Sequence, residues 1–246
     1  MKRIKLIVSY DGTNYCGWQI QPNGITIEEV LNKTISSLIK EDVKVVGASR
    51  TDSGVHALGN VAVFDSSTTI PPERIMYALN QLLPKDIVVT HSEEVTLDWH
   101  PRYRKSVKTY EYRIQTGTVY DPIYRYSHYF VSYHLDFKAM EKATKYLVGE
   151  HDFAGFTREE NQERNTLRTI YEAGWTKSDN ILVFTIKGNG FLYNMVRMIV
   201  GMLLQIGMGN YQPEYIKEIL DSKGDGVVKL TAQPQGLILK GIRYED

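Results

Sequence analysis

Residues 5–12 read KLIVSYDG, and they predict the first strand of the chain and the turn after it. An apolar run that ends in an Asp-Gly pair is typical of a strand followed by a turn. Thr26 begins a helix, because Glu29 stands three residues later and completes a capping box. A second helix follows Pro72 and ends at Pro84. Three further apolar runs predict strands, over residues 43–48, 61–64 and 87–90.

The second half of the chain repeats this order of strand, helix, two strands, helix and strand with longer connections. Asp136 caps one helix, and an apolar stretch after Gly190 predicts another. Strands are predicted over residues 109–115, 169–176, 181–187 and 237–244. Two such β-α-β-β-α-β units predict an α/β fold of two ferredoxin-like halves, one at residues 1–104 and one at residues 105–246.

The composition is that of a neutral protein, in which 29 Lys and Arg residues balance 29 Asp and Glu residues. A nucleic-acid partner would therefore have to bind a local basic patch. The single cysteine, Cys16, excludes an intramolecular disulfide and a Cys-rich zinc site. The sequence contains no metal-ligand spacing, P-loop or dinucleotide motif, so we expect neither a metal nor a cofactor.

The most apolar part of the chain, residues 191–208, could be mistaken for a membrane span. Asn194, Arg197 and Gln205 interrupt it, which favours a buried helix instead. The N-terminal residues contain no apolar segment of the kind found in secretory signals. We therefore expect a cytoplasmic protein without a membrane partner.

Residues 49–56 read SRTDSGVH and connect two apolar strands; we call them the Asp52 loop. An arginine, a hydroxyl, a carboxylate and a histidine gathered in one loop favour a functional site, since such sites lie on loops held by rigid strands. The same Asp-Ser-Gly sequence also suits an ordinary turn, in which the aspartate bonds nearby amides. From these residues alone, both interpretations are open.

Arg197 stands on a helix whose other residues are almost all apolar. An arginine drawn into such an interior needs a paired anion. Asp52 is one candidate for that anion among the acidic residues of the chain. Alternatively, the Arg197 side chain extends along the edge of the core and keeps its charge in water.

Residues 99–113 combine five basic residues with one acid and four aromatic residues. Aromatic rings offer stacking surfaces for bases, and Lys and Arg neutralise phosphates, so this mixture suits single-stranded or flipped nucleotides. The alternative is a strand with one basic face in solvent and its aromatic side chains in the core.

Five segments, in matching order along nearly the whole chain, resemble motifs of the tRNA pseudouridine synthase A family. They are YDGTNYCGWQ at residues 10–19, RTDSGVHA at 50–57, KTYEY at 108–112, GEHDF at 149–153 and NGFLYNMVR at 189–197. Two positions depart from the family pattern: Ser49 stands where the family usually has glycine, and Ser53 where it usually has alanine. All of these residues are small, so the resemblance in the loop holds.

The resemblance implies two lobes around a central, mostly antiparallel sheet flanked by helices, working as a homodimer. It also implies that uridine is isomerised to pseudouridine in the anticodon arm of tRNA, at tRNA positions 38, 39 and 40, without a cofactor. Asp52 would be the nucleophile and Arg197 its charge partner. Tyr110 would stack on the target base and is a candidate for proton transfer.

The remaining roles concern substrate binding. The resemblance implies that Arg50 helps to extrude the target nucleotide and that Leu237 lines the uracil pocket. Further candidates for contacts with the substrate come from the Asp52 loop and the basic stretch: His56, Arg102, Arg104 and Lys108.

Two other functions fit parts of this pattern. A non-catalytic RNA-binding protein would use the same basic and aromatic surface. A hydrolase that acts on small molecules through a carboxylate would need no affinity for tRNA. Neither of these two functions needs both tRNA binding and the Asp52 carboxylate, whereas a pseudouridine synthase needs both.

Overall fold

The computed structural model describes residues 1–158, 165–224 and 228–245. The chain forms two compact units. Unit 1 consists of Met1–Ser106 and Ile238–Asp246, and unit 2 consists of Val107–Leu237. The predicted boundaries put the last strand, residues 237–244, in the second half of the chain. In the structure this strand belongs to unit 1 from Ile238 onward.

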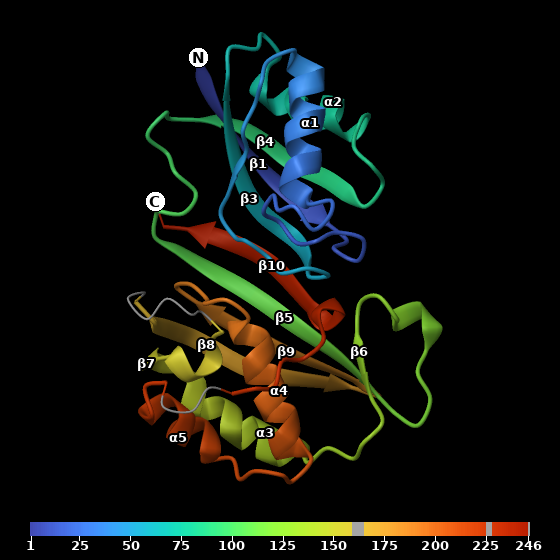
Figure 1. The fold of residues 1–246 in the computed structure, drawn as a ribbon, viewed down its shortest axis with the longest axis vertical. Helices are drawn as coiled ribbons and strands as arrows, with labels where there is room; N and C mark the ends of the chain where they lie inside the picture. The colour runs from blue at the N-terminus through green and yellow to red at the C-terminus, as the bar shows by residue number, and fades with distance from the viewer. Residues whose placement is uncertain (159–164, 225–227, 246) are drawn as a thin grey trace. The chain divides into compact units, whose positions relative to one another are not determined.

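Unit 1 contains five strands and two α-helices in its described residues (Figure 1). They are β1 (Lys2–Tyr10), α1 (Ile27–Ile39), β2 (Val46–Gly47), β3 (His56–Ser66), α2 (Ile75–Asn80), β4 (Ile87–Val95) and β10 (Leu237–Tyr244). The strand order is β4-β1-β3, and the other edge of β3 is shared by β2 and β10. Strands β1, β2 and β4 run antiparallel to their neighbours, whereas β10 is parallel to β3 and places Ile238 opposite His56.

The strands of unit 2 pair in the order β5-β9-β8-β7, each antiparallel to its neighbour, with β6 parallel to β5. Its elements are β5 (Ser106–Thr116), β6 (Tyr129–Val131), α3 (Phe137–Thr144), β7 (Gly149–Asp152), β8 (Leu167–Ser178), β9 (Ile181–Gly188), α4 (Met195–Gly207) and α5 (Tyr215–Asp221). Short 3-10 turns complete the two units, at Pro72–Arg74, Pro122–Tyr124, Lys145–Leu147, Ala154–Phe156 and Pro234–Gly236. The predicted α/β fold with mostly antiparallel pairing is confirmed.

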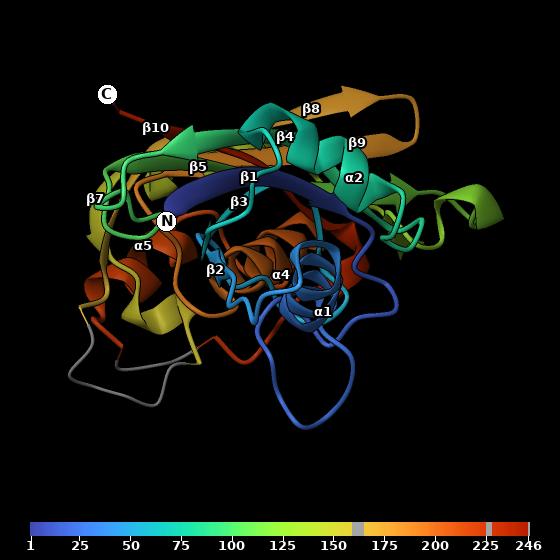
Figure 2. The same ribbon diagram turned by 90° about the horizontal axis from the view of Figure 1, so that it is seen from above.

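Local sequence explains where the first helix begins and which side it buries. The Thr26 side chain accepts a hydrogen bond from the Glu29 amide, as the capping box predicted. Ile27, Leu31 and Ile35 are fully buried on one side of α1. Figure 2 shows α1 nearly end-on, on one side of β1.

The strand predicted over residues 43–48 is much shorter in the structure, where β2 covers only Val46–Gly47. The cause is a set of side chains on α1 that satisfy the backbone before the strand can begin. The Val43 amide donates to Ser36 Oγ at 3.0 Å, and the Val45 amide donates to Asn32 Oδ1 at 2.8 Å. These bonds replace the ladder that a longer strand would need.

Helix α4 is buried along most of its length, as the apolar stretch predicted. Within residues 1–158, 165–224 and 228–245, no helix is long and apolar enough to cross a membrane.

Candidate active site

The Asp52 loop leads from β2 into β3, and residues 10–19, which we call the opening motif, hold its backbone. The Trp18 amide donates to the Thr51 carbonyl at 3.0 Å. The Tyr15 carbonyl accepts from the Gly54 amide at 3.3 Å and from Ser53 Oγ at 3.2 Å. Two motifs that are far apart in the sequence thus form one structural piece.

Asp52 itself is half-buried and begins a tight turn. Its carbonyl accepts from the Val55 amide at 3.1 Å, and Gly54 has a φ of 76°, which glycine adopts without strain. The ordinary-turn interpretation is therefore correct for the backbone. It does not account for the arginine and carboxylate side chains that the same turn carries.

The opening motif packs so closely on the loop that Gly12 has no room for a side chain. A Cβ at Gly12 would lie 2.1 Å from the Val55 carbonyl oxygen. Because backbone atoms cannot rotate away, Gly12→Ala should lower the melting temperature by about 4–8 °C and weaken the activity. Thermal denaturation followed by circular dichroism checks this.

Gly241→Ala on β10 is the matched control, because an added Cβ there has no atom within 4 Å. Equal melting temperatures for Gly12→Ala and Gly241→Ala would contradict the close packing.

His56 closes the Asp52 loop and is buried, with 7% of its surface exposed. Its Nδ1 accepts from the Gly12 amide at 3.0 Å and lies 3.1 Å from Asp11 Oδ1. The other ring nitrogen, Nε2, is buried without a hydrogen-bond partner in the part of the chain that the structure describes. The His56 ring therefore links the loop to the opening motif.

The carboxyl group of Asp11 is tuned by the same contacts. Burial acts to raise its pKa, but hydrogen bonds from Thr13 and the neighbouring His56 outweigh burial and lower the pKa of Asp11. Asp11 Oδ1 accepts from the Thr13 amide at 3.0 Å and from Thr13 Oγ1 at 2.6 Å. These bonds favour the ionised form of Asp11 beside the loop.

Two arginines place positive charge beside the Asp52 loop. Arg50 and Arg102 are both exposed, and Arg102 Nε donates to the Gly47 carbonyl at 2.7 Å. Desolvation, and after it the positive charge of Arg50, lower the pKa of the Arg102 guanidinium. The two cations thus repel each other, and an anionic ligand such as a phosphate would reduce this repulsion.

The aromatic residues of the basic stretch divide into two groups. Trp99 is buried edge-on against Tyr244, with ring centroids 4.9 Å apart, and Tyr112 is fully buried with its hydroxyl donating to the Gln233 carbonyl at 2.6 Å. Tyr103 is 84% exposed and stacks on His100 at 4.0 Å. The core interpretation is correct for Trp99 and Tyr112, whereas Tyr103 is open to solvent beside the exposed Arg104.

In unit 2, Arg197 lies in the first turn of α4 and is half-buried. Its Nε donates to the Ala232 carbonyl at 2.8 Å, and a terminal nitrogen donates to Asn194 Oδ1 at 3.0 Å. The Ala232 amide returns a bond to the Arg197 carbonyl at 3.0 Å. A cation near the N-terminus of a helix opposes the helix dipole, at a cost of about 0.3–1 kcal/mol, so helix stability does not explain why an arginine stands here.

Tyr110 and Leu237 are also buried in unit 2. Tyr110 on β5 is 7% exposed and meets Phe191 edge-on, with ring centroids 5.1 Å apart. Lys108 lies two residues earlier, on the same face of β5, and is half-buried. Leu237 is 5% exposed at the start of β10.

The segment before Leu237 connects these side chains. Its Ala232 binds Arg197 on α4, and its Gln233 binds Tyr112, two residues after Tyr110 on the same face of β5. The structure therefore gathers the predicted residues in two groups. Unit 1 holds Asp52, Arg50, His56, Arg102 and Arg104, and unit 2 holds Tyr110, Arg197, Leu237 and Lys108.

Sequence reasoning did not find two features of these groups. One is the bond from Arg102 to Gly47, which joins the basic stretch to the last residue of β2, just before the Asp52 loop, across 55 positions of sequence. The other is the Ala232 carbonyl as an acceptor for Arg197, which no side-chain motif could signal.

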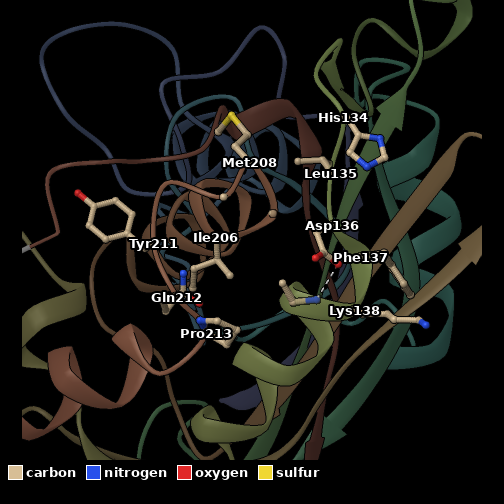
Figure 3. A pocket seen from close by; sticks show the side chains of 13 residues that line it. His134, Leu135, Asp136, Phe137, Lys138, Ile206, Met208, Tyr211, Gln212 and Pro213 are labelled. Atoms are coloured by element: carbon tan, nitrogen blue, oxygen red, sulfur yellow. Dashed lines mark hydrogen bonds between the residues drawn. The ribbon is translucent and has the colours of Figure 1, made fainter.

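A cavity of about 680 Å³ opens elsewhere in unit 2, between the start of α3 and the end of α4 (Figure 3). Leu135, Ile206, Met208 and Tyr211 contribute to its lining. Arg197 lies at the opposite end of α4 from Ile206. This cavity contains none of the residues predicted for the active site.

Comparison with known proteins gives a consistent result. A family model described as tRNA pseudouridine synthase matches residues 6–104 and 143–245. The tRNA pseudouridine synthase A of Acetivibrio thermocellus is 43% identical over 244 residues, covering 99% of this chain and 100% of the relative. The proteins of that name from Ruminiclostridium cellulolyticum (44% over 245 residues, 99% and 100% covered) and Exiguobacterium sp. (42% over 245 residues, 100% and 99% covered) are similarly close.

A solved structure of an archaeal box H/ACA sRNP Nop10-Cbf5 complex aligns with 98% of this chain and 49% of that chain, at 12% identity and a TM-score of 0.36, which is too distant to bear on function. The relatives, by contrast, extend over both groups of predicted residues, and the family model covers all of these residues except Lys108 and Tyr110. This chain therefore belongs to the tRNA pseudouridine synthase A family.

Proposed function

We propose that this protein isomerises uridine to pseudouridine in the anticodon arm of tRNA, at tRNA positions 38, 39 and 40, as a cytoplasmic homodimer. The observation that carries the proposal is the half-buried carboxylate of Asp52, held in a backbone-clamped turn beside the exposed Arg50 and Arg102. A carboxylate nucleophile next to phosphate-binding cations is what this reaction on RNA requires.

The reaction needs no outside group. The C1′–N1 glycosidic bond breaks, the uracil turns while it stays bound, and C1′ joins C5, whose hydrogen leaves as a proton while N1 takes up a proton. Asp52 forms a covalent bond to the nucleotide and is released again at the end, as carboxylates do in other covalent enzymes. Attack at C1′ and addition at C6 both satisfy this balance.

Unit 2 would supply the groups that support Asp52 and the detached base. The Arg197 guanidinium would be the charge partner that keeps the carboxylate ionised and oriented in a site closed to water. Tyr110 would stack on the uracil and is a candidate for proton transfer. Leu237 would form an aliphatic wall of the base pocket.

Binding of the RNA would use the cations of the Asp52 loop and the basic stretch. A base inside a stem or a stacked loop cannot be reached in place, so the nucleotide must flip out, and Arg50, two residues before the nucleophile, would assist this step. Arg102, Arg104 and Lys108 would contact phosphates, and His56 would contribute from the end of the loop. Shape and phosphates dominate recognition of folded RNA.

The experiment that tests the function is incubation of the purified protein with a tRNA transcript that has uridine at positions 38 to 40. We expect pseudouridine at those positions, detected by carbodiimide modification and primer extension. A stable complex without any modified uridine would favour the non-catalytic RNA-binding protein, and absence of tRNA binding would favour the small-molecule hydrolase.

Arg104→Ala should weaken tRNA binding about equally for all tRNA sequences and reduce the slope of log Kd against log salt by about one. The reason is that Arg104 is exposed and would neutralise one phosphate. Arg74→Ala is the matched control, because it removes an exposed charge from the 3-10 turn before α2. Filter-binding titrations between low and physiological salt measure both slopes, and the same slope for both variants would contradict the contact.

The homodimer can be checked directly by light scattering coupled to gel filtration. One chain has a mass of 28.2 kDa, so a homodimer should have about twice that mass. A concentration-independent mass of a single chain would refute the homodimer and leave the other parts of the proposal unchanged.

A further inference from the structure

Asn60 is a fully buried polar residue on β3 whose side chain binds the backbone of Ser49, the first residue of the Asp52 loop. The Ser49 amide donates to Asn60 Oδ1 at 3.2 Å, and Asn60 Nδ2 donates to the Ser49 carbonyl at 3.0 Å. A neighbouring strand would supply the same pair of bonds. The side-chain amide thus fixes the backbone where β2 has already ended.

The same amide nitrogen reaches a second part of the loop through Tyr10. Asn60 Nδ2 donates to the Tyr10 hydroxyl at 3.3 Å, and that hydroxyl bonds Thr51 Oγ1 at 2.8 Å. Tyr10 is 4% exposed and Thr51 is 7% exposed. Because an amide nitrogen can only donate, the Tyr10 oxygen accepts from Asn60 while it bonds Thr51.

These three residues form a buried chain of hydrogen bonds that ends one residue before Asp52. A buried amide or hydroxyl costs free energy unless its bonds are made, so a chain of this kind is tolerated only where its bonds are well formed. It fixes the backbone at Ser49 and the side chain at Thr51. These two residues lie on either side of Arg50, and Thr51 directly precedes Asp52.

We infer that Asn60 and Tyr10 are positioning residues that hold the Asp52 carboxylate in the direction of attack. The inference rests on the proposed role of Asp52 as the nucleophile. Neither residue reaches the reacting atoms in this role: Asn60 acts through Ser49 and Tyr10, and Tyr10 acts through Thr51. Misplacement of a catalytic group by about 1 Å can lower a rate about 100-fold.

Tyr10→Phe and Asn60→Leu should therefore lower kcat by about ten- to a hundredfold. Phe keeps the buried ring and removes only the hydroxyl, and Leu keeps the approximate size of the amide. The Kd for tRNA should stay within about twofold, because both side chains are buried away from the RNA. A merely structural role would lower stability and the fraction of active protein but would leave kcat per active site unchanged.

A second asparagine of unit 1 provides the matched control. Asn80 at the end of α2 binds the backbone of Val89 in the same way, with Nδ2 donating to the Val89 carbonyl at 2.8 Å and Oδ1 accepting from the Val89 amide at 2.8 Å. Asn80→Leu removes the same two bonds away from the Asp52 loop. We expect it to lower the melting temperature and to leave kcat unchanged.

A double-mutant cycle tests whether the Tyr10 hydroxyl acts through Thr51. Thr51→Val removes the hydroxyl at the other end of the 2.8 Å bond. If the bond is the unit that matters, the double variant Tyr10→Phe with Thr51→Val loses about as much kcat as either single variant. Multiplied losses would mean that Tyr10 acts in another way and would overturn the Tyr10 part of the inference.

The full experiment measures kcat under multiple turnover, with active sites counted, for wild type, Tyr10→Phe, Asn60→Leu, Asn80→Leu and Asp52→Asn. We expect a lowered kcat in Tyr10→Phe and Asn60→Leu, an unchanged kcat in Asn80→Leu, and no activity in Asp52→Asn. Unchanged kcat in Tyr10→Phe and Asn60→Leu, with Asp52→Asn inactive, would overturn the inference alone. Full activity of Asp52→Asn would instead overturn the proposed function on which it rests.

Discussion

Replacing Asp52 with asparagine should abolish pseudouridine formation, with a loss on the order of 10³-fold or more. Asparagine has nearly the size of aspartate but no carboxylate oxygen that can form a covalent bond to the nucleotide and leave again. The loop should keep its shape, because the backbone bonds that hold it use the Thr51 and Asp52 carbonyls and the Gly54 and Val55 amides, which the substitution leaves in place. Binding of tRNA should change little. Modified uridines counted by primer extension, together with a binding titration, measure both effects.

Asp42→Asn provides the control for this change. Asp42 is an exposed aspartate of the same unit, in the segment between α1 and β2. The Asp42→Asn variant should retain full activity. If Asp52→Asn also turned over at the wild-type rate, the nucleophile would be a different group.

Replacing Arg197 with methionine should lower kcat by about 100-fold. Methionine fits the apolar helix α4 and has a similar length, so the fold should be retained. What is lost is the positive charge that, in the proposal, keeps Asp52 ionised and oriented. Binding of tRNA should be nearly unchanged, because Arg197 is half-buried and held by Ala232 and Asn194.

Arg197→Lys separates the charge from the shape of the side chain. Lysine keeps the charge but lacks the planar fork that binds the Ala232 carbonyl and Asn194 Oδ1 together. It should recover part of the lost kcat. Full activity of Arg197→Met would mean that the side chain only extends along the edge of the core and keeps its charge in water.

Much of the fold follows from local chemistry and could be predicted. Thr26 caps α1, Asp136 caps α3, and the alternation of apolar residues defines β1, β5 and β9. The strand at residues 237–244 is also correct in its bounds. These features depend on residues that are only a few positions apart in the sequence.

What could not be predicted depends on contacts between distant residues. The short β2 follows from side chains on α1 that bind the backbone at Val43 and Val45, and no local pattern records those bonds. Strand β10 pairs with β3, which lies far away in the sequence, so the compact units differ from the two contiguous halves. Sequence periodicity identifies a strand but not its neighbour.

The candidate site divides in the same way. Asp52 and Arg197 could be identified because a carboxylate in an Arg-Thr-Asp loop and an arginine in an apolar helix are unusual in themselves. Asn60 could not, because one polar residue next to an apolar run has no meaning until Ser49 and Tyr10 are placed beside it. Residues that position a catalytic group act through packing, which the sequence does not display.

The central claim is that this protein isomerises uridine through Asp52, and tritium release from tRNA labelled at C5 of its uridines tests it most directly. Forming the C1′–C5 bond expels the hydrogen at C5, whereas binding alone leaves it in place. We predict time-dependent release of tritium into water by the wild-type protein and none above background by Asp52→Asn, with both proteins bound to the tRNA. Equal release by the two proteins, or release by neither from a tRNA with uridine at positions 38 to 40, would contradict the account.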